Sequence, residues 1–385
     1  MLERPFNNIR LKEGRVYRGL TITDLADKLN MSKQMISKYE NGKSIPSFEV
    51  MMQISAILNF PKDYFYENPV NVSTGNTYFR SLLTSSKKER EMQYDRVKYL
   101  TIIRALLEEY VDFPDLDIPV FSESESTSIE AMTRSLREYW GLSGEPIKDM
   151  VYLLETKGFV VSTSTLINKN IDAFGCQQVI NDKAYYSIIL SDNKNNFYRR
   201  QFDASHELAH KILHDPYLNL NDLSKDEFKQ VEQEANEFAA AFLLPQEEFL
   251  RDVLLHPTDL MYYKSLKKKW GVSIGAMLMR AYKLGAINTS TYQYMQRVIS
   301  QKGWRTKEPF DDIKELNHPV SMQQAIELLI ENDYITGDKL LYRLSKEYGL
   351  TLFASEVENL LGIEEGYLST SDGALPNNLV SLKSI

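Results

Sequence analysis

Three polar residues have the types and spacing of a zinc-dependent hydrolase. His206, Glu207 and His210 form the pattern H-E-x-x-H, and the stretch 202–214 around them holds three of the five histidines in the chain. In a helix, residues four apart share one face, so the two imidazoles can bind one zinc ion. Glu207 then lies beside the metal, where its carboxylate can accept a proton from bound water. The pattern is short, so alone it arises by chance about as often as it marks a site.

A second segment downstream can complete such a site. Residues 232–245 read E-Q-E-A-N-E-F-A-A-A-F-L-L-P, a strong helix pattern that Pro245 ends. A carboxylate on this helix can supply a third zinc ligand and leave the fourth position for water.

Together these segments resemble the ImmA/IrrE family of zinc metallopeptidases, which pairs H-E-x-x-H-x-x-x-H with E-x-x-A-N-x-F-A-x-x-L-L-x-P. The resemblance implies that Zn²⁺ is the cofactor, that His206 and His210 are ligands, and that Glu207 is the catalytic base. The Glu of E-x-x-A-N falls on Glu232, which becomes the third ligand. Glu234 is the rival, because it directly precedes the Ala of that motif.

Two further positions bear on this resemblance. His214 continues the helix face of the two ligand histidines, and a structural, hydrogen-bonded role is favoured over one that supports the metal site. Ala209 stands where the family often has Gly, a mild departure that leaves metal binding intact. The resemblance covers roughly residues 79–308.

The N-terminal part of the chain carries a different signature. Residues 6–66 read as a run of short helices, and Asn30-Met31 makes a tight turn between the second and the third. Ser32 can cap the third helix, and Gly42 stops it. The pattern L-T-x-x-x-L-A-x-x-x-x-x-S-x-x-x-I-S-x-x-E-x-G, from Leu20 to Gly42, closely resembles the XRE or Cro-repressor type of helix-turn-helix.

This resemblance implies that the third helix enters the major groove of double-stranded DNA. Arg10 and Arg15, with Lys43, are candidate phosphate contacts. Ile22 stands where many members have Gln, which puts one phosphate contact in doubt. A fold of this kind that mediates only protein contacts is the alternative. The candidate DNA-binding residues are Ser32, Lys33, Gln34, Ser37, Lys38 and Lys43.

Composition narrows the class of protein. The 385 residues, 43% of them hydrophobic, predict two or three domains with packed cores. The single cysteine, Cys176, excludes an intramolecular disulfide and a cysteine zinc cluster. Neither a signal peptide nor a membrane span is indicated, so we expect a cytoplasmic protein with no membrane partner. Of the net charge of −8, residues 1–66 contribute +3, which favours nucleic-acid contact at that end.

The patterns predict a mainly α fold with a small β-sheet, of the α+β class. We expect a helix-turn-helix domain over 1–66, a linker over 67–78, a peptidase domain with a helical lead-in over 79–308, and a C-terminal helical region of unknown role over 309–385. Residues 159–161 and 185–190 are strand candidates. The second of these strands precedes the H-E-x-x-H helix, and its free edge is expected to pair with an extended substrate.

The sequence therefore predicts a DNA-binding regulator with a zinc-dependent peptidase domain that cleaves a regulatory protein. We expect it to act as a homodimer on an inverted-repeat operator, because one short helix reads too few bases. In the competing hypothesis the peptidase-like domain only senses a ligand or a partner. A weaker hypothesis makes the protein an antitoxin or immunity component.

Overall fold

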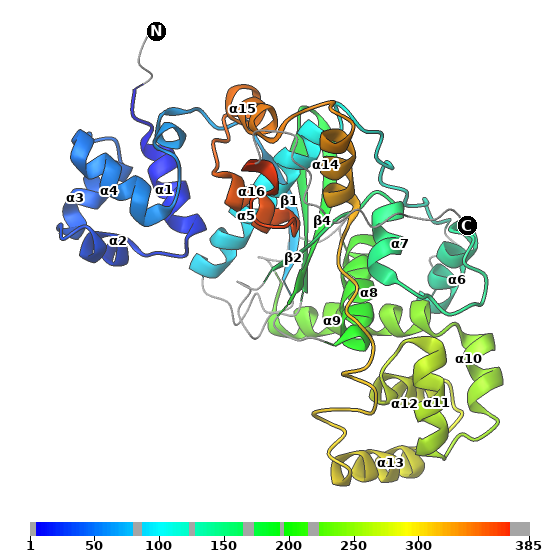
Figure 1. Ribbon diagram of the computed structural model, residues 1–385. Helices are drawn as coiled ribbons and strands as arrows, with labels where there is room; N and C mark the ends of the chain where they lie inside the picture. The colour runs from blue at the N-terminus through cyan, green and yellow to red at the C-terminus, as the bar shows by residue number, and fades with distance from the viewer. Residues whose placement is uncertain are drawn as a thin grey trace. The chain divides into compact units, whose positions relative to one another are not determined.

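The structure, a computed structural model, describes residues 5–79, 87–122, 128–164, 173–192, 196–214 and 223–369 (Figure 1). Its internal contacts divide the chain into two compact units. Unit 1 comprises residues 1–72, 86–112 and 321–385, and unit 2 comprises residues 73–85 and 113–320. The chain thus passes between the units several times, and this division cuts across the four consecutive segments expected from the sequence.

Unit 2 contains a four-stranded sheet in the order β1-β3-β4-β2. Strands β3 and β4 form an antiparallel hairpin, and its two turn residues, Asn181 and Asp182, have positive φ as a tight hairpin turn requires. Strand β2 pairs with β4 in parallel, and β1 pairs with β3 antiparallel. The strand bounds are β1 Ser73–Phe79, β2 Val160–Ser164, β3 Ala173–Ile180 and β4 Lys183–Ser191.

The strand order bears on two expectations, the free edge of β4 and the linker over 67–78. β4, the strand before the H-E-x-x-H segment, has no free edge for a substrate, because β3 and β2 pair with it on its two sides. Residues 67–78, expected as a linker, hold most of β1. Their polar composition gives no strand pattern, because β1 lies at an edge where pairing with β3 through the backbone suffices.

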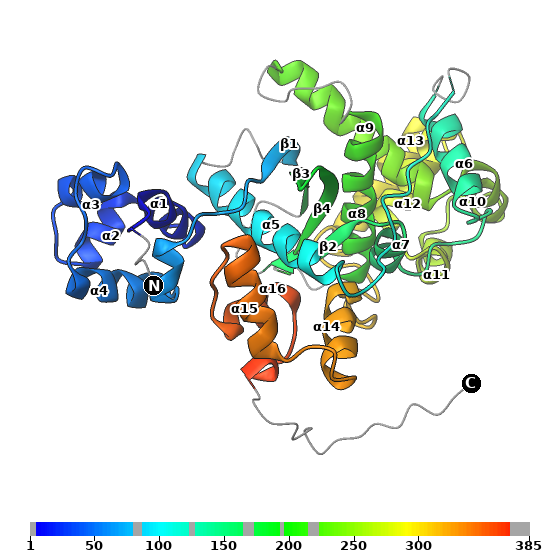
Figure 2. The same cartoon turned by 90° about the horizontal axis from the view of Figure 1, so that it is seen from above.

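Two long helices carry the motif segments. α8 (Phe197–Leu213) begins at Asn196, whose side chain accepts a hydrogen bond from the Arg199 backbone N–H at 3.1 Å. α9 (Lys225–Leu243) begins with a capping box between Ser224 and Glu227. The two helices pack against each other, and α8 also packs against β3 and β4 (Figure 2).

One hydrophobic core joins the sheet, α8, α9 and the shorter helices of unit 2. Trp140, Phe242 and Trp270 are among its buried aromatic residues, and the Trp140 and Phe242 rings meet edge to face. This packing gives α8 and α9 a fixed relative position. The shorter helices are α6 (Ile129–Tyr139), α7 (Met150–Thr156), α10 (Gln246–Val253), α11 (Leu260–Trp270), α12 (Ile274–Lys283) and α13 (Thr289–Gln301).

Unit 1 contains the helix-turn-helix. Thr21 caps its second helix through a capping box with Asp24, and Ser32 and Ser47 cap the third and fourth helices. The tight turn between the second and third helices places Asn30 at a φ of 51°, which Asn tolerates. The elements are α1 (Asn8–Tyr17), α2 (Ile22–Lys28), α3 (Lys33–Glu40), α4 (Phe48–Leu58) and the 3₁₀ helix η1 (Lys62–Tyr66).

The C-terminal helices belong to this same unit. Buried Glu67 accepts hydrogen bonds from the hydroxyls of Ser345, at 2.6 Å, and Thr351. The Tyr17 hydroxyl on α1 donates to Glu356. The C-terminal region, to which the sequence assigns no role, therefore contacts the helix-turn-helix segment within unit 1. The remaining elements of unit 1 are α5 (Lys87–Leu107), α14 (Ser321–Glu331), α15 (Gly337–Tyr348), α16 (Ala354–Leu361) and the 3₁₀ helix η4 (Tyr367–Ser369).

The predicted fold class is confirmed, because the described residues are mainly helical with one small sheet. β3 is absent from the prediction. Every residue of β3 but two is buried, and a strand paired on both sides lacks the alternation of a half-exposed strand.

Candidate metal centre and nucleic-acid interface

Three side chains from α8 and α9 converge on one point in unit 2. His206 Nε2 lies 3.0 Å from His210 Nε2, one helical turn away on α8. Glu232 on α9 places its two carboxylate oxygens 3.5 Å from His206 Nε2 and 3.4 Å from His210 Nε2. One ligand atom from each of the three residues lies within 4.8 Å of the others. Such a grouping is what a small divalent cation needs.

The donor set fits zinc chemically. Two imidazole nitrogens and one carboxylate form a set that catalytic zinc sites use, with the fourth position open for water. Zinc–nitrogen bonds of 2.0–2.1 Å in a tetrahedron place the two nitrogens about 3.3 Å apart, close to the separation seen here. Both histidines are almost fully buried, so this end of α8 is already shielded from solvent.

Glu232 interacts electrostatically with His206 and His210. Burial raises the pKa of Glu232, but hydrogen bonds and positive charge from His206 and His210 outweigh it and bring the pKa to about 2. Glu232 is therefore an anion at every ordinary pH. A carboxylate with its charge directed at two imidazoles is ready to bind a cation.

Glu207 lies next to His206 on α8 and is 1% exposed. Its position in the sequence places it beside the convergence point but outside the set of three ligand atoms. A buried carboxylate next to a cation site can accept a proton from a water molecule held there. This is the arrangement that the H-E-x-x-H pattern predicts.

The two carboxylates that compete for the ligand role occupy different places. Glu232 faces His206 and His210, whereas Glu234 Oε2 lies 3.2 Å from His214 Nε2. Glu234 is outside the ligand grouping that the structure brings together. Burial, followed by the nearby His210, lowers the pKa of His214 to about 4, so this imidazole is neutral at physiological pH.

Two arginines fix the C-terminal end of α9. Arg137 on α6 donates to the Phe242 carbonyl at 2.7 Å and to the Ser143 carbonyl at 2.9 Å. Arg280 on α12 donates to the Leu244 carbonyl at 3.1 Å and pairs with Glu130. These cations satisfy carbonyls that the helix leaves unpaired and favour the negative end of its dipole. The local sequence gives neither arginine a role at the site.

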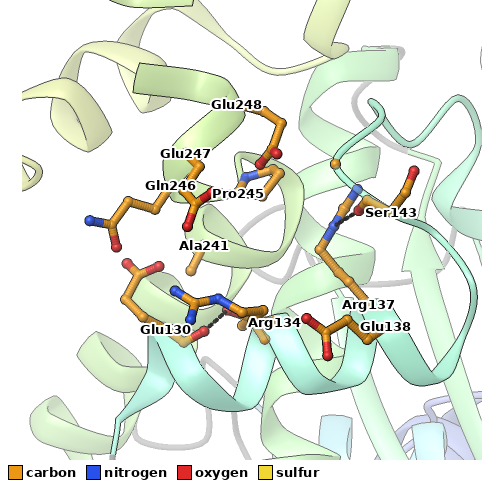
Figure 3. Close-up of a pocket in the computed structure, with 12 residues that line it drawn as sticks. Glu130, Arg134, Arg137, Glu138, Ser143, Ala241, Pro245, Gln246, Glu247 and Glu248 are labelled. Carbon is orange, nitrogen blue, oxygen red and sulfur yellow. Dashed lines mark hydrogen bonds between the residues drawn. The ribbon is translucent and has the colours of Figure 1, made fainter. Parts of the chain in front are cut away.

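A pocket of about 280 Å³ lies at this same end of α9 (Figure 3). It is lined by α6 residues such as Glu130 and Arg134 and by the first turn of α10, including Glu247 and Glu248. The lining residue Ala241 is nine positions beyond Glu232, about 13 Å along the helix axis. The pocket is therefore separate from the convergence point of the histidines.

On the helix-turn-helix, the predicted contact residues lie mainly on an open face. Lys33, Gln34 and Lys38 of α3 are exposed, as is Lys43 in the loop that follows, while Ser37 is half-buried. Ser32 is exposed, and its hydroxyl accepts from the Met35 backbone N–H at 3.3 Å. Ser32 therefore has a structural role as helix cap in addition to any contact with DNA.

Arg10 and Arg15, the two other expected phosphate contacts, are buried and do not lie on this exposed face. Arg15 is buried and pairs with Glu40 through two hydrogen bonds of 2.5 and 2.9 Å. Arg10 is fully buried, pairs with Glu13 at 2.7 Å and donates to the Gly349 carbonyl. Their assignment as phosphate contacts is wrong, because both guanidinium groups are buried and paired, in part with Glu40 and Gly349, which lie far away in the sequence.

Comparison with known protein families matches both the helix-turn-helix segment and the segment that contains α8 and α9. Residues 11–65 match the family model described as Helix-turn-helix, and residues 154–282 match the one described as IrrE N-terminal-like domain. The chain therefore joins an XRE-type helix-turn-helix to an ImmA/IrrE-type peptidase domain.

The curated relatives share a short part of the chain. The Endothelial differentiation-related factor 1 homolog of Danio rerio is 48% identical over 44 residues, which are 11% of this chain and 30% of that protein. The protein of the same name from Xenopus laevis is 42% identical over 48 residues, 12% of this chain and 33% of its own length. The chain thus spans about a third of these relatives. In the part of the chain that the structure describes, none of the helices has the length and apolar character of a membrane span.

Proposed function

We propose that this protein is a transcriptional regulator whose peptidase domain uses zinc to cleave a regulatory protein. The observation that carries this proposal is the convergence of His206, His210 and Glu232 from two separate helices onto one point. With Glu207 buried next to that point, the chain holds a full set of groups for peptide hydrolysis.

Each group has a distinct part in the proposed reaction. His206, His210 and Glu232 would hold the ion, which polarises the scissile carbonyl and acidifies water when bound. Glu207 accepts the proton of the attacking water and then delivers it to the departing amine. The buried walls of the site exclude bulk water, which strengthens these electrostatic interactions.

The DNA-binding part of the proposal rests on α3 and its surroundings. Gln34 and the exposed lysines face outward, where Gln can make two hydrogen bonds to adenine and the lysines can contact phosphates or guanine. Ile45 and Phe48, exposed to 70% and 67%, provide an apolar surface near α3 for a second copy of the chain. We therefore propose a homodimer on an inverted-repeat operator in the cytoplasm.

The test is the Glu207→Gln variant of the full chain, compared with wild type in zinc content and in cleavage of proteins encoded beside it. The amide cannot accept the water's proton, so we expect full zinc occupancy and a rate of cleavage lower by about 10²- to 10⁴-fold. Glu237→Gln, the same change at an exposed site on α9, is the matched control and should behave as wild type.

Three outcomes would contradict the proposal in different ways. If the wild-type protein contains no zinc after metal supplementation, the metallopeptidase proposal is wrong. Zinc without any cleavage would favour the competing hypothesis of a sensor domain. Cleavage that Glu207→Gln leaves unchanged would remove Glu207 as the base.

A further inference from the structure

A chain of polar side chains runs from His210 away from the proposed metal position, and the proposed reaction does not use it. His210 Nδ1 lies 3.1 Å from His214 Nδ1, and His214 Nε2 lies 3.2 Å from Glu234 Oε2. Glu234 Oε1 accepts a hydrogen bond from Gln230 Nε2 at 2.9 Å. The two histidines are buried, whereas the Glu234 side chain is 38% exposed.

The partners at each step decide where the protons lie. A carboxylate only accepts hydrogen bonds, so the bond to Glu234 requires the proton of His214 on its Nε2. A neutral imidazole then has a bare Nδ1, which accepts from Nδ1–H of His210. His210 consequently keeps a proton on Nδ1, and a metal can replace the proton on its Nε2, which faces Glu232 Oε1 at 3.4 Å.

We propose that Glu234 and His214 are positioning residues that hold His210 in the tautomer and ring orientation that a metal requires. The proposal rests on the metal site of the proposed function and assigns new roles to two residues outside it. Zinc-binding histidines generally donate their second ring nitrogen to a carboxylate or carbonyl. Here a second histidine stands between the ligand and the carboxylate.

The two ligand histidines differ in this respect. His206 Nδ1 is buried and has no hydrogen-bond partner among the described residues, so no comparable chain orients it there. Orientation through Nδ1 is therefore a feature of His210 within the described part of the chain. The opposing interpretation is that His214 only fills space in the core, and the two make different predictions for zinc affinity.

The experiment measures zinc affinity of the folded full-length protein by competition with a chelator. In His214→Phe a ring of similar size remains but no acceptor faces His210, and we expect affinity to fall about 10- to 100-fold. In His214→Asn the side-chain oxygen replaces the Nδ1 acceptor, so much of the lost affinity should return. Equal affinity for the two variants, or no loss in His214→Phe, would overturn the proposal.

Glu234→Lys tests the outer end of the chain at a half-exposed position where the fold should tolerate it. A lysine only donates, so His214 would have to carry its proton on Nδ1 and His210 on Nε2, where the metal binds. We expect about a 10-fold loss of zinc affinity or more. Glu237→Lys makes the same charge change at an exposed site on α9 and should lose less than about threefold. Equal losses of zinc affinity in these two variants would mean that the added positive charge alone causes the loss, and would overturn the role of Glu234.

Nitrogen-15 NMR of the histidine rings in metal-free protein separates this inference from the proposed function. We expect protonated Nδ1 in His210 and protonated Nε2 in His214, and the His210 tautomer should shift in Glu234→Lys. A His210 Nδ1 without a proton in the wild type would overturn the inference even if zinc binds. If the predicted tautomers are found but wild type binds no zinc, the metallopeptidase fails while the hydrogen-bonded chain stands.

Discussion

The two functional helices, α3 in unit 1 and α8 in unit 2, present their residues in opposite ways. On α3, the proposed DNA contacts Lys33, Gln34 and Lys38 are exposed. On α8, His206 and His210 are buried against α9 and already lie with Glu232 around one point. The α3 surface is formed by a single helix, whereas the α8–α9 site needs two helices packed on a common core.

This difference predicts different sensitivities. Changes to exposed residues of α3 should alter DNA affinity or specificity and leave the fold unchanged, because substitutions of exposed side chains change stability little. Changes in the α8–α9 site should cost much more, because each group there also satisfies or neutralises its buried neighbours.

The largest effect is expected from losing a ligand in α8. His206→Ala or His210→Ala leaves two protein ligands, and each ligand contributes about 3 kcal/mol of a total of about 10–16 kcal/mol in tightly bound zinc sites. We expect zinc affinity to fall by about 100-fold or more. Elemental analysis and chelator competition measure it, with His318→Ala, an exposed histidine, as the control. Equal zinc content in all these proteins would place the metal elsewhere.

The second prediction distinguishes a buried ion pair from a DNA contact. Arg15→Ala leaves Glu40 buried without its partner, so we expect a loss of about 3–5 kcal/mol in the free energy of unfolding of unit 1. Denaturant titration measures it, and Glu40→Ala should cost a similar amount. Unchanged stability combined with a weaker salt dependence of DNA binding would restore the phosphate role of Arg15.

The third prediction concerns the exposed residues of α3 and its loop. Gln34→Ala should cost about 1–3 kcal/mol at one base pair and relax specificity there, because Gln can pair with adenine through two hydrogen bonds. Lys43→Ala should instead weaken binding to all sequences and lower the salt slope by about 1.

Mobility shifts of the full chain on genomic and random DNA at two salt concentrations check this third prediction. Binding without sequence preference in the wild type would leave the helix-turn-helix as a surface for protein contacts.

The smallest expected effect is on the pH dependence of stability and involves Asp95 of unit 1. Burial, reinforced by the nearby Glu13, raises the pKa of Asp95 on α5 to about 8. Between about pH 4 and pH 8 the folded protein therefore holds a proton that the unfolded chain has lost, and stability falls as pH rises through this window. Asp95→Asn should remove this dependence and raise stability at pH 8 by about 1 kcal/mol or more, or about 3 °C in Tm. A gain of the same size at pH 5 and pH 8 would contradict this explanation.

Much of the candidate site was predictable from short sequence patterns. The spacing of His206 and His210 requires only the helical period, and Ser32 and Gly42 mark the ends of α3 in the expected places. Glu232 was favoured over Glu234 by the motif, and the geometry places Glu232 at the two histidines. Zinc binding and catalysis themselves stay predictions.

Other features depended on segments far apart in the sequence. Arg10 and Arg15 looked like surface cations, yet their partners include Glu40 and the Gly349 carbonyl. Strand β1 lies in a stretch with the composition of a linker, because its pairing with β3 supplies what its own sequence lacks. The link from His210 through His214 to Glu234 likewise exists only when α8 and α9 are packed together.

The helices, their caps and the faces that carry the proposed site residues follow from the sequence alone, because they depend on interactions within three or four residues. Tertiary packing selected which buried charge meets which partner and which strand pairs with which neighbour. It also brought the C-terminal helices to the helix-turn-helix. The reason is that hydrophobic burial drives packing without direction, so ion pairs and hydrogen bonds between distant segments are selected only once the core has formed.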